Sequence, residues 1–156
     1  MPDILIPLYS LPPIPAPVAG IVIRRPLAHE KSVIRSWIKE HFHAGWADEF
    51  DTSFSHQPVT TFIALRERKL IGFASYEATC RAFFGPTGVI KEERGLGIGR
   101  MLLLHAMYGL RDMGYGYGII GGAGPTDFYV KTLGGIIIAD SWPGIYPSRP
   151  IDYGTQ

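Results

Sequence analysis

Cysteine is almost absent from this chain, because Cys80 is the single one among 156 residues. No disulfide can therefore form within the chain, and no Cys-x-x-Cys metal pair exists. The five histidines show neither His-x-His nor His-Glu-x-x-His spacing, so we expect no metal site. No neighbouring residue suggests activation of Cys80, and we expect it to be a buried, unreactive thiol.

Net charge is also nearly absent, since 15 basic residues oppose 14 acidic ones and leave +1. This balance gives no electrostatic footprint for nucleic acid or for an anionic membrane surface. No run of about 18 apolar residues is free of breakers, so we expect no membrane span. Hydrophobic residues at 46% and charged residues at 19% are typical of a globular domain with a buried core.

Residues 4–18 are apolar but interrupted by prolines at positions 7, 12, 13, 15 and 17. They lack the basic start and unbroken helical core of a signal peptide, so the expected location is cytoplasmic. The prolines predict an extended N-terminal arm over residues 1–20, outside the core, followed by one domain over residues 21–156. The arm either lies across its own domain or packs on a second subunit.

Apolar spacing of three and four residues predicts helices over residues 27–42 and 97–113. Two β-rich runs around a charged turn predict a hairpin over residues 60–66 and 70–80. Shorter strands are expected at 21–25, 83–90, 115–121 and 136–139, and short helices within 45–58 and at 125–133. The order β–α–α–β–β–β–α–β–α–β predicts an α/β fold, a mixed sheet with helices on its faces.

A glycine-rich turn begins the clearest predicted helix. Gly95, Gly97 and Gly99 stand at alternate positions, and Arg94 and Arg100 flank them. Glycines remove the Cβ atoms that would keep a bulky anion away from the backbone. The first N–H groups of a helix have no partner one turn earlier, so they can bind phosphate oxygens. This turn is suited to a diphosphate.

Other anion-binding turns fit the residues less well. A P-loop requires Lys-Ser or Lys-Thr after its last glycine, and neither is present. A dinucleotide-binding turn requires a third glycine or alanine where this sequence has Leu102 or Ile98. It also requires an acidic residue after the next strand, and residues 115–122 offer none. The alternative that this turn binds no ligand is still open, although the flanking arginines and the long helix favour a ligand.

Residues 94–99, with the sequence RGLGIG, resemble the acyl-CoA-binding signature of the GNAT superfamily of N-acetyltransferases. That signature lies between the family's fourth strand and third helix. Residues 127–134, DFYVKTLG, resemble the second signature, in which Phe-Tyr opens a short helix that ends before glycine. The element order over residues 21–139 matches too, and residues 83–146 resemble a bacterial subgroup. The seventh strand of the family stays undefined, because residues 144–147 make a poor strand.

The resemblance implies a GNAT-like acyl-CoA N-acyltransferase fold with about six to seven strands and about four helices. It also implies acetyl-CoA as co-substrate and no metal. Pantetheine would pair with the fourth strand, where an N–H after Pro86 would hold the oxyanion, and the diphosphate would bind the glycine-rich turn. The residues implied in acetyl-CoA binding are Thr87, Val89, Ile90, Arg94, Gly95, Leu96, Gly97, Ile98, Gly99, Arg100, Phe128 and Lys131.

The resemblance also implies catalytic roles. Tyr129 aligns with the tyrosine that protonates the departing CoA thiolate; its alternative is ring packing under the helix. Glu77 is the first candidate for the general base; the alternative is that Glu77 is merely a solvated strand residue. The segment that covers the acceptor site in the family holds further candidates for a base or a pocket wall. These are His43, Trp46, Glu49, Phe50, Asp51, Phe54 and His56.

The predicted function is transfer of acetyl from acetyl-CoA to a primary amine of a small-molecule acceptor by direct attack. Two alternatives stay open: a CoA-binding sensor or interaction module without efficient catalysis, and a peptide Nα-acetyltransferase. Aromatic residues near the acceptor site hint at an apolar or cationic acceptor. The apolar arm and the tail at Trp142, Ile145 and Tyr146 suggest a homodimer. The sequence names neither the acceptor nor the acyl length.

Overall fold

The computed structural model describes residues 1–147, 151 and 154. Within them, seven strands form one mixed sheet in the order β2-β3-β4-β5-β6-β1-β7. The strands are β1 (Ile4–Pro7), β2 (Ile21–Arg24), β3 (Thr61–Arg66), β4 (Lys69–Tyr76), β5 (Phe83–Val89), β6 (Tyr117–Ile120) and β7 (Ile136–Ile137). The predicted fold class, a mixed sheet with helices on its faces, is confirmed.

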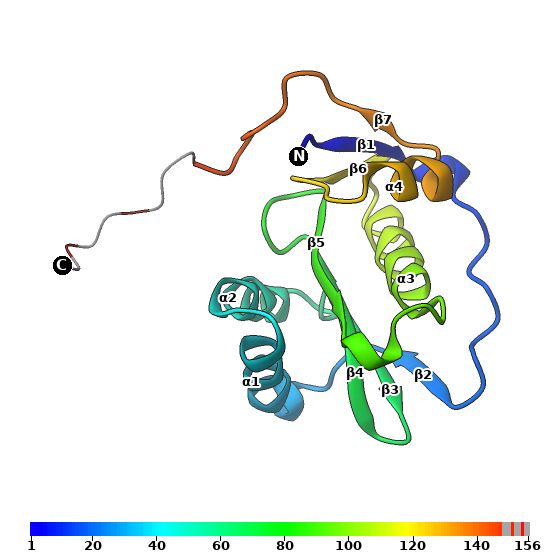
Figure 1. The fold of residues 1–156 in the computed structure, drawn as a ribbon, viewed down its shortest axis with the longest axis vertical. Helices are drawn as coiled ribbons and strands as arrows, with labels where there is room; N and C mark the ends of the chain where they lie inside the picture. The colour runs from blue at the N-terminus through cyan, green and yellow to red at the C-terminus, as the bar shows by residue number, and fades with distance from the viewer. Residues whose placement is uncertain (148–150, 152–153, 155–156) are drawn as a thin grey trace.

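Helices cover both faces of the sheet (Figure 1). They are α1 (Lys31–His41), α2 (Ala44–Thr52), α3 (Ile98–Asp112) and α4 (Thr126–Leu133). α1 and α2 lie on one side of β3–β5, and α3 lies on the other side, with α4 beyond it near β1 and β7. Single 3-10 turns occupy Leu8–Ser10, Ala28–Glu30, Ser53–Ser55 and Lys91–Glu93.

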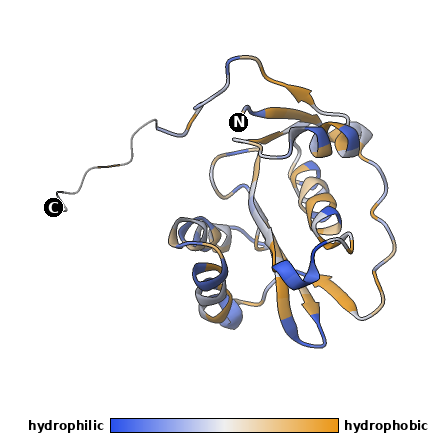
Figure 2. Cartoon of the chain, viewed as in Figure 1, coloured by the Kyte–Doolittle hydropathy of each residue, from blue (hydrophilic) through white to orange (hydrophobic). Residues whose placement is uncertain are grey.

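Two apolar clusters fill the space between the sheet and these helices. On the α1 and α2 side, Ile38, Phe50 and Phe73 are each fully buried. On the other side α3 buries Leu102, Leu110 and most of their neighbours along the helix. Figure 2 shows the same division, with apolar residues along the strands and α3 and hydrophilic residues on the outer surfaces of α1 and α2. Burial of this apolar surface fixes the two layers on the sheet.

The N-terminal segment differs from the arm predicted for residues 1–20. Ile4–Pro7 forms β1, which lies antiparallel between β6 and β7. Ile4, Ile6 and Leu8 are each 0% exposed. They alternate with a period of two, as expected of a strand with one buried face. The prediction that this segment lies outside the core was therefore wrong for its first third. β1 is also the seventh strand, which the sequence had left undefined.

Residues 11–18 have no regular structure and run along the outside of α3 from β1 to β2 (Figure 1). The Tyr108 hydroxyl on α3 donates to the carbonyl of Pro12 at 2.9 Å. Leu11 and Val18 pack against the main apolar cluster. This part of the segment therefore contacts its own domain.

Most predicted elements agree with the structure, but the strand predicted over residues 70–80 ends earlier. β4 stops at Tyr76, and Glu77 follows with φ +55°. A non-glycine residue in the left-handed region cannot continue a strand. Glu77 therefore belongs to the loop after β4.

Candidate active site

β5 and β6 are neighbours in the sheet, but they pair over only two residues. The parallel pairs are Phe83 with Ile119 and Phe84 with Ile120. β6 then ends, while β5 continues along β4 through residues 87–89. The backbone of β5 beyond Phe84 therefore has no strand partner on its β6 side.

Two backbone N–H groups of β5 point into this gap. The N–H of Ile90 donates to the carbonyl of Ile71 on β4 at 3.0 Å. Backbone groups of successive residues in an antiparallel ladder point in alternate directions. Gly88 therefore faces β4 as Ile90 does, and the N–H groups of Thr87 and Val89 face the gap.

The glycine-rich turn lies between β5 and α3. Gly95 and Gly97 have φ values of +85° and +81°, which L side chains rarely adopt. A Cβ at either position would meet no atom within 4 Å, so open space lies in front of the turn. Met101 N–H bonds to the Gly97 carbonyl at 3.1 Å, so the N–H groups of residues 98–100 precede the helical ladder.

The arginines beside the turn differ in their contacts. Arg94 Nε donates to the Val89 carbonyl at 3.0 Å, which holds this side chain beside the end of β5. Arg94 and Arg100 are both exposed. Together with the helix N-terminus they give the turn a positive potential.

Two cavities follow the gap between β5 and β6. The smaller one, of about 170 Å³, runs from Val89 and Gly99 to Tyr129. The larger one, of about 530 Å³, runs from Tyr129 to Glu49 on α2. Their linings share Phe84, Thr87, Pro125 and Tyr129. A ligand that entered along the glycine-rich turn would meet a ligand in the larger cavity beside Tyr129.

Tyr129 lies on α4 and is 8% exposed. Its ring packs edge-to-face on Phe84, with centroids 6.5 Å apart, and on Phe128 at 5.3 Å. Burial raises the pKa of the Tyr129 phenol above its ordinary value of 10.0. Its hydroxyl group makes no hydrogen bond within the described residues. Tyr129 is thus a protonated phenol at the junction of the two cavities.

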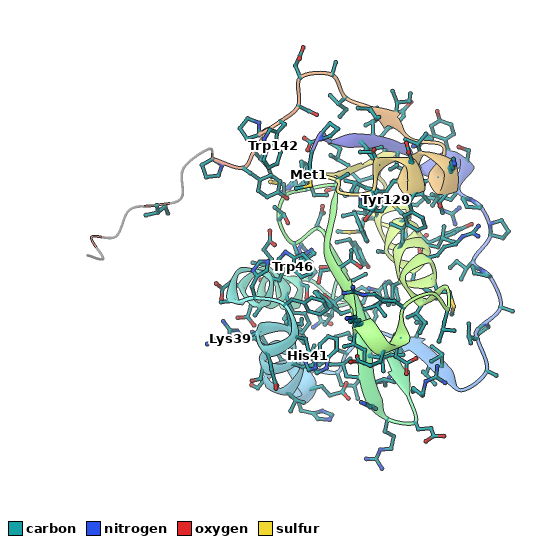
Figure 3. The ribbon with its side chains drawn as sticks, in the orientation of Figure 1. Met1, Lys39, His41, Trp46, Tyr129 and Trp142 are labelled. Carbon is teal, nitrogen blue, oxygen red and sulfur yellow. The ribbon has the colours of Figure 1, made fainter. Side chains whose placement is uncertain are left out.

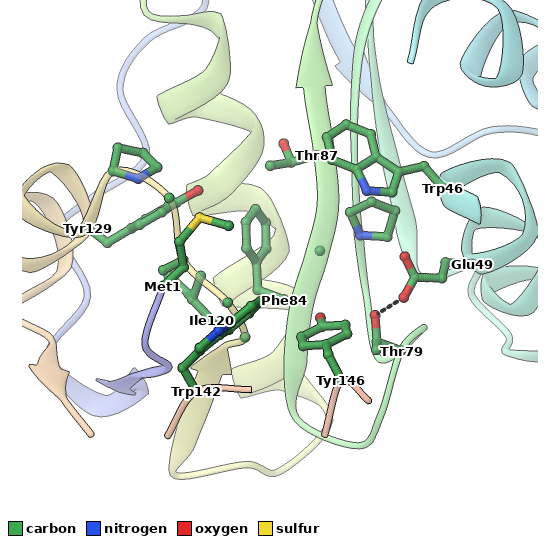
Figure 4. Close-up of a pocket in the computed structure, with 17 residues that line it drawn as sticks. Met1, Trp46, Glu49, Thr79, Phe84, Thr87, Ile120, Tyr129, Trp142 and Tyr146 are labelled. Atoms are coloured by element: carbon green, nitrogen blue, oxygen red, sulfur yellow. Dashed lines mark hydrogen bonds between the residues drawn. The ribbon is translucent and has the colours of Figure 1, made fainter. Parts of the chain in front are cut away.

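Glu49 lies on the opposite side of the larger cavity from Tyr129 (Figure 4). The Thr79 hydroxyl donates to Glu49 Oε1 at 2.7 Å, and Thr79 also lines the cavity. Glu49 is half-buried and projects from α2. One carboxylate oxygen is thereby held in place, while Oε2 makes no hydrogen bond within the described residues.

Aromatic rings line both sides of the larger cavity. Trp46 comes from α2, while Trp142 and Tyr146 come from the segment that follows β7. Figure 3 shows Trp142 near Met1 and Tyr129, and Trp46 on the α2 side of β5. Burial, and then the negative charges of Glu49 and Asp3, raise the pKa of Tyr146.

A family model described as the acetyltransferase (GNAT) family matches residues 30–134. This span is well over half of the chain and contains both signatures, the glycine-rich turn and α4. The chain belongs to the GNAT acetyltransferase family. The predicted resemblance to this family is therefore confirmed. A search of curated protein sequences found no match.

Several solved structures share this GNAT fold. A GCN5-related N-acetyltransferase from Sphaerobacter thermophilus has a TM-score of 0.70 at 18% identity, over 88% of this chain and 48% of its own. The glucosamine N-acetyltransferase region of a fungal multi-domain β-N-acetylglucosaminidase has a TM-score of 0.70 at 17% identity, over 88% of this chain and 19% of its own. This GNAT chain thus spans about half the length of the first and a fifth of the second.

A GNAT acetyltransferase from Brucella melitensis, solved in complex with acetyl-CoA, is nearer in length. Its TM-score is 0.57 at 17% identity, over 83% of this chain and 91% of its own. At such identities the likeness shows the fold. Within the described residues, no helix combines the length and hydropathy of a membrane span.

The structure brings most of the predicted acetyl-CoA residues of this GNAT chain together between β5, the start of α3 and α4. Thr87, Val89, Gly99 and Phe128 line the smaller cavity. Residues 94–98 and Arg100 form or follow the turn at its entrance. Ile90 does not fit, because its N–H donates to Ile71 and its carbonyl accepts from Glu93 at 3.0 Å. Lys131 is exposed on α4 and lines neither cavity.

Glu77, the predicted general base, does not line either cavity. Its carboxylate accepts from the Tyr115 hydroxyl at 2.7 Å and from the N–H of Ala82. Both bonds hold the loop between β4 and β5. Glu49 is the acidic candidate that lines the larger cavity.

The other candidates from residues 43–56 have structural contacts elsewhere. Asp51 accepts from Arg35 Nε at 2.7 Å and ties α2 to α1. Phe50 is in the core, Phe54 packs on it, and only Trp46 of the three aromatic residues lines the cavity. His43 caps α2, and neither His43 nor His56 lines a cavity.

Cys80 was predicted to be buried, but it is partly exposed.

Among the cavity residues that were not predicted as part of the site, two are aromatic residues of the tail. Trp142 and Tyr146 were expected at most to support a dimer, but both line the larger cavity. The aromatic content of the tail was the signal in the sequence. Only the tertiary structure brings these two side chains into one cavity with Trp46 and Glu49 of α2.

Proposed function

We propose that this chain transfers the acetyl group of acetyl-CoA to a primary amine of a small-molecule acceptor. The observation that carries the proposal is the junction of two cavities beside Tyr129. One cavity leads from the glycine-rich turn, and the other leads to Glu49. A donor and an acceptor that entered from opposite ends would react there.

The residues present fit acetyl-CoA. Open space lies in front of Gly95 and Gly97, and the N–H groups of residues 98–100 precede the helical ladder. These groups can bind a diphosphate. The N–H groups of Thr87 and Val89 can pair with an amide-bearing chain such as pantetheine. Acetyl-CoA supplies the activated acetyl group as a thioester.

In the proposed reaction the amine nitrogen attacks the acetyl carbon, so that a C–N bond forms and the C–S bond breaks. The N–H of Thr87 donates to the carbonyl oxygen as negative charge develops on it. Glu49 takes the amine proton, directly or through water, and Tyr129 gives its proton to the departing thiolate. Because burial keeps the pKa of Tyr129 high, its proton is present at neutral pH.

A cavity that holds a free carboxylate oxygen at one end and a protonated phenol at the other favours catalysis over a sensor without turnover. The smaller cavity alone would be enough to bind CoA. The larger one adds space for an acceptor and a proton acceptor for it.

The homodimer stays a prediction with less support than the sequence gave it. Ile4, Ile6 and Leu8 lie in the chain's own core, so they offer nothing to a second subunit. Trp142 and Ile145 are exposed at 54% and 47%. Light scattering that gives the mass of one chain would remove the dimer, and the proposed reaction does not depend on it.

Thiol release from acetyl-CoA in the presence of a panel of primary amines tests the proposal. Glu49→Gln should lower kcat about 10²- to 10⁴-fold, as expected when a general base is lost. Glu77→Gln is the matched control, since it removes the same charge outside the cavities. Equal rates for Glu49→Gln and the parent protein, or a rate loss confined to Glu77→Gln, would contradict Glu49 as the base.

A further inference from the structure

The larger cavity carries a distinct distribution of charge. Glu49 is the one charged side chain among the described residues that line it. A second carboxylate lies just behind the wall, where Asp3 Oδ1 accepts from the N–H of Gly122 at 2.8 Å. No described lysine, arginine or histidine lines the cavity. The one cationic group of a described lining residue is the α-amino group of Met1. The side chains of the cavity therefore suit a cation and oppose an anion.

Two aromatic rings form the wall over the turn after β6. A Cβ built on Gly122 would lie 3.4 Å from Trp142 Cζ3 and 3.5 Å from Tyr146 Cε2, so both rings cover this residue. Trp46 adds a third ring on the α2 side (Figure 4). Such rings attract an ammonium group through their faces and bury apolar surface along their edges.

The remaining walls are also apolar. Phe84 and Ile120 are 5% and 3% exposed, and they line the cavity between Trp142 and Tyr129. The cavity volume of about 530 Å³ is in the range of small-molecule sites. An acceptor therefore meets carbon surface along most of its length and a carboxylate at one place.

We infer that the acceptor is a primary amine whose single charge is its ammonium group, carried on an apolar, flat body. This inference rests on the proposed function. The body lies against Trp142 and Tyr146, and the ammonium group faces Glu49, which takes the proton that this group must lose before its nitrogen can attack. Amines that carry a carboxylate or a phosphate are excluded, because the anion would be close to Glu49 and Asp3 with no cationic side chain to pair with.

Three probe amines separate the parts of this inference. 2-Phenylethylamine has the proposed features, L-phenylalanine adds a carboxylate to the same skeleton, and ethylamine lacks the ring. We expect kcat/KM for 2-phenylethylamine to exceed the values for both others by at least about tenfold, from ring contacts and charge repulsion. A kcat/KM for L-phenylalanine equal to that for 2-phenylethylamine would overturn the exclusion of anions. An equal kcat/KM for ethylamine would overturn the role of the apolar body.

A variant at the aromatic wall tests where the body binds. Trp142→Ala should raise KM for 2-phenylethylamine about tenfold and leave KM for ethylamine within about twofold. Tyr9→Ala is the control, since Tyr9 is 70% exposed and packs edge-to-face on Tyr117 outside the cavity. An equal change for both amines, or no change, would overturn the placement against Trp142.

The failure of this inference can be told apart from failure of the proposed function. Amine binding to the CoA-saturated protein is read by quenching of tryptophan fluorescence, whether or not turnover occurs. Acetyl-CoA that binds and is turned over with L-phenylalanine or ethylamine as the best amine would leave the function intact and overturn the inference. Absence of acetyl-CoA binding would overturn both.

Discussion

Replacement of Tyr129 by phenylalanine is the most informative single change. The ring of the variant keeps its packing on Phe84 and Phe128, because both contacts are made by ring faces and edges. The lost hydroxyl has no hydrogen-bond partner within the described residues, so no buried group loses its partner. The free energy of unfolding should therefore change by less than about 0.5 kcal/mol.

The expected effect on the rate is much larger. Loss of a positioned general acid lowers turnover about 10²- to 10⁴-fold. That corresponds to about 2.7–5.4 kcal/mol in the activation free energy. The diphosphate and pantetheine contacts proposed above lie on the glycine-rich turn and β5, so the acetyl-CoA Kd should stay within about twofold.

Steady-state thiol release measures kcat, and calorimetry with acetyl-CoA measures Kd. Tyr108→Phe is the matched control, since it removes a phenol that donates to the Pro12 carbonyl at 2.9 Å. It should cost about 1 kcal/mol of stability and leave kcat unchanged. A Tyr129→Phe variant with parental kcat, or with kcat and affinity lowered equally, would refute the leaving-group role.

Three further predictions concern the fold and the turn. Ile4→Ala should lower the free energy of unfolding by about 2–5 kcal/mol in urea titration, because β1 is in the core; a change below about 0.5 kcal/mol would contradict this. Gly97→Ala should cost about 1 kcal/mol for its φ of +81° and weaken acetyl-CoA binding in calorimetry, whereas Gly116→Ala, in open space, should change neither. Hydrogen bonds from Arg24 lower the pKa of Glu30 to about 2. The stability that this partly exposed ion pair adds, below about 1 kcal/mol, is therefore present above pH 4.5 and lost towards pH 2. The difference in urea stability between parent and Glu30→Gln should therefore shrink over that range, and a constant difference would count against the ion pair.

The sequence predicted those parts of the site that depend on local pattern. The glycine-rich turn, α3 and α4 were each correctly placed, because their signals lie within the elements themselves. The helical spacing of apolar residues predicts α3 directly. Gly134 ends α4 with φ +68°, as its position suggested. Local sequence is sufficient where local backbone geometry decides the structure.

Features that depend on distant contacts were missed. The prolines after Pro7 led to the prediction of an extended arm, in spite of the alternation of Ile4, Ile6 and Leu8. That segment becomes a strand only because it pairs with both β6 and β7. Choice of the base likewise needs the tertiary structure. Glu77 leaves the sheet with φ +55°, while Thr79 holds Glu49 at the cavity across 30 residues of chain.

Titration of the folded protein with acetyl-CoA in a calorimeter tests the central claim most directly. The claim is that the turn at Gly95 and Gly97, together with the unpaired side of β5, holds the diphosphate and pantetheine of the co-substrate. We predict saturable binding of one acetyl-CoA per chain that Gly97→Ala weakens and Gly116→Ala leaves unchanged. No heat at any temperature tried, or equal binding by all three proteins, would contradict the account.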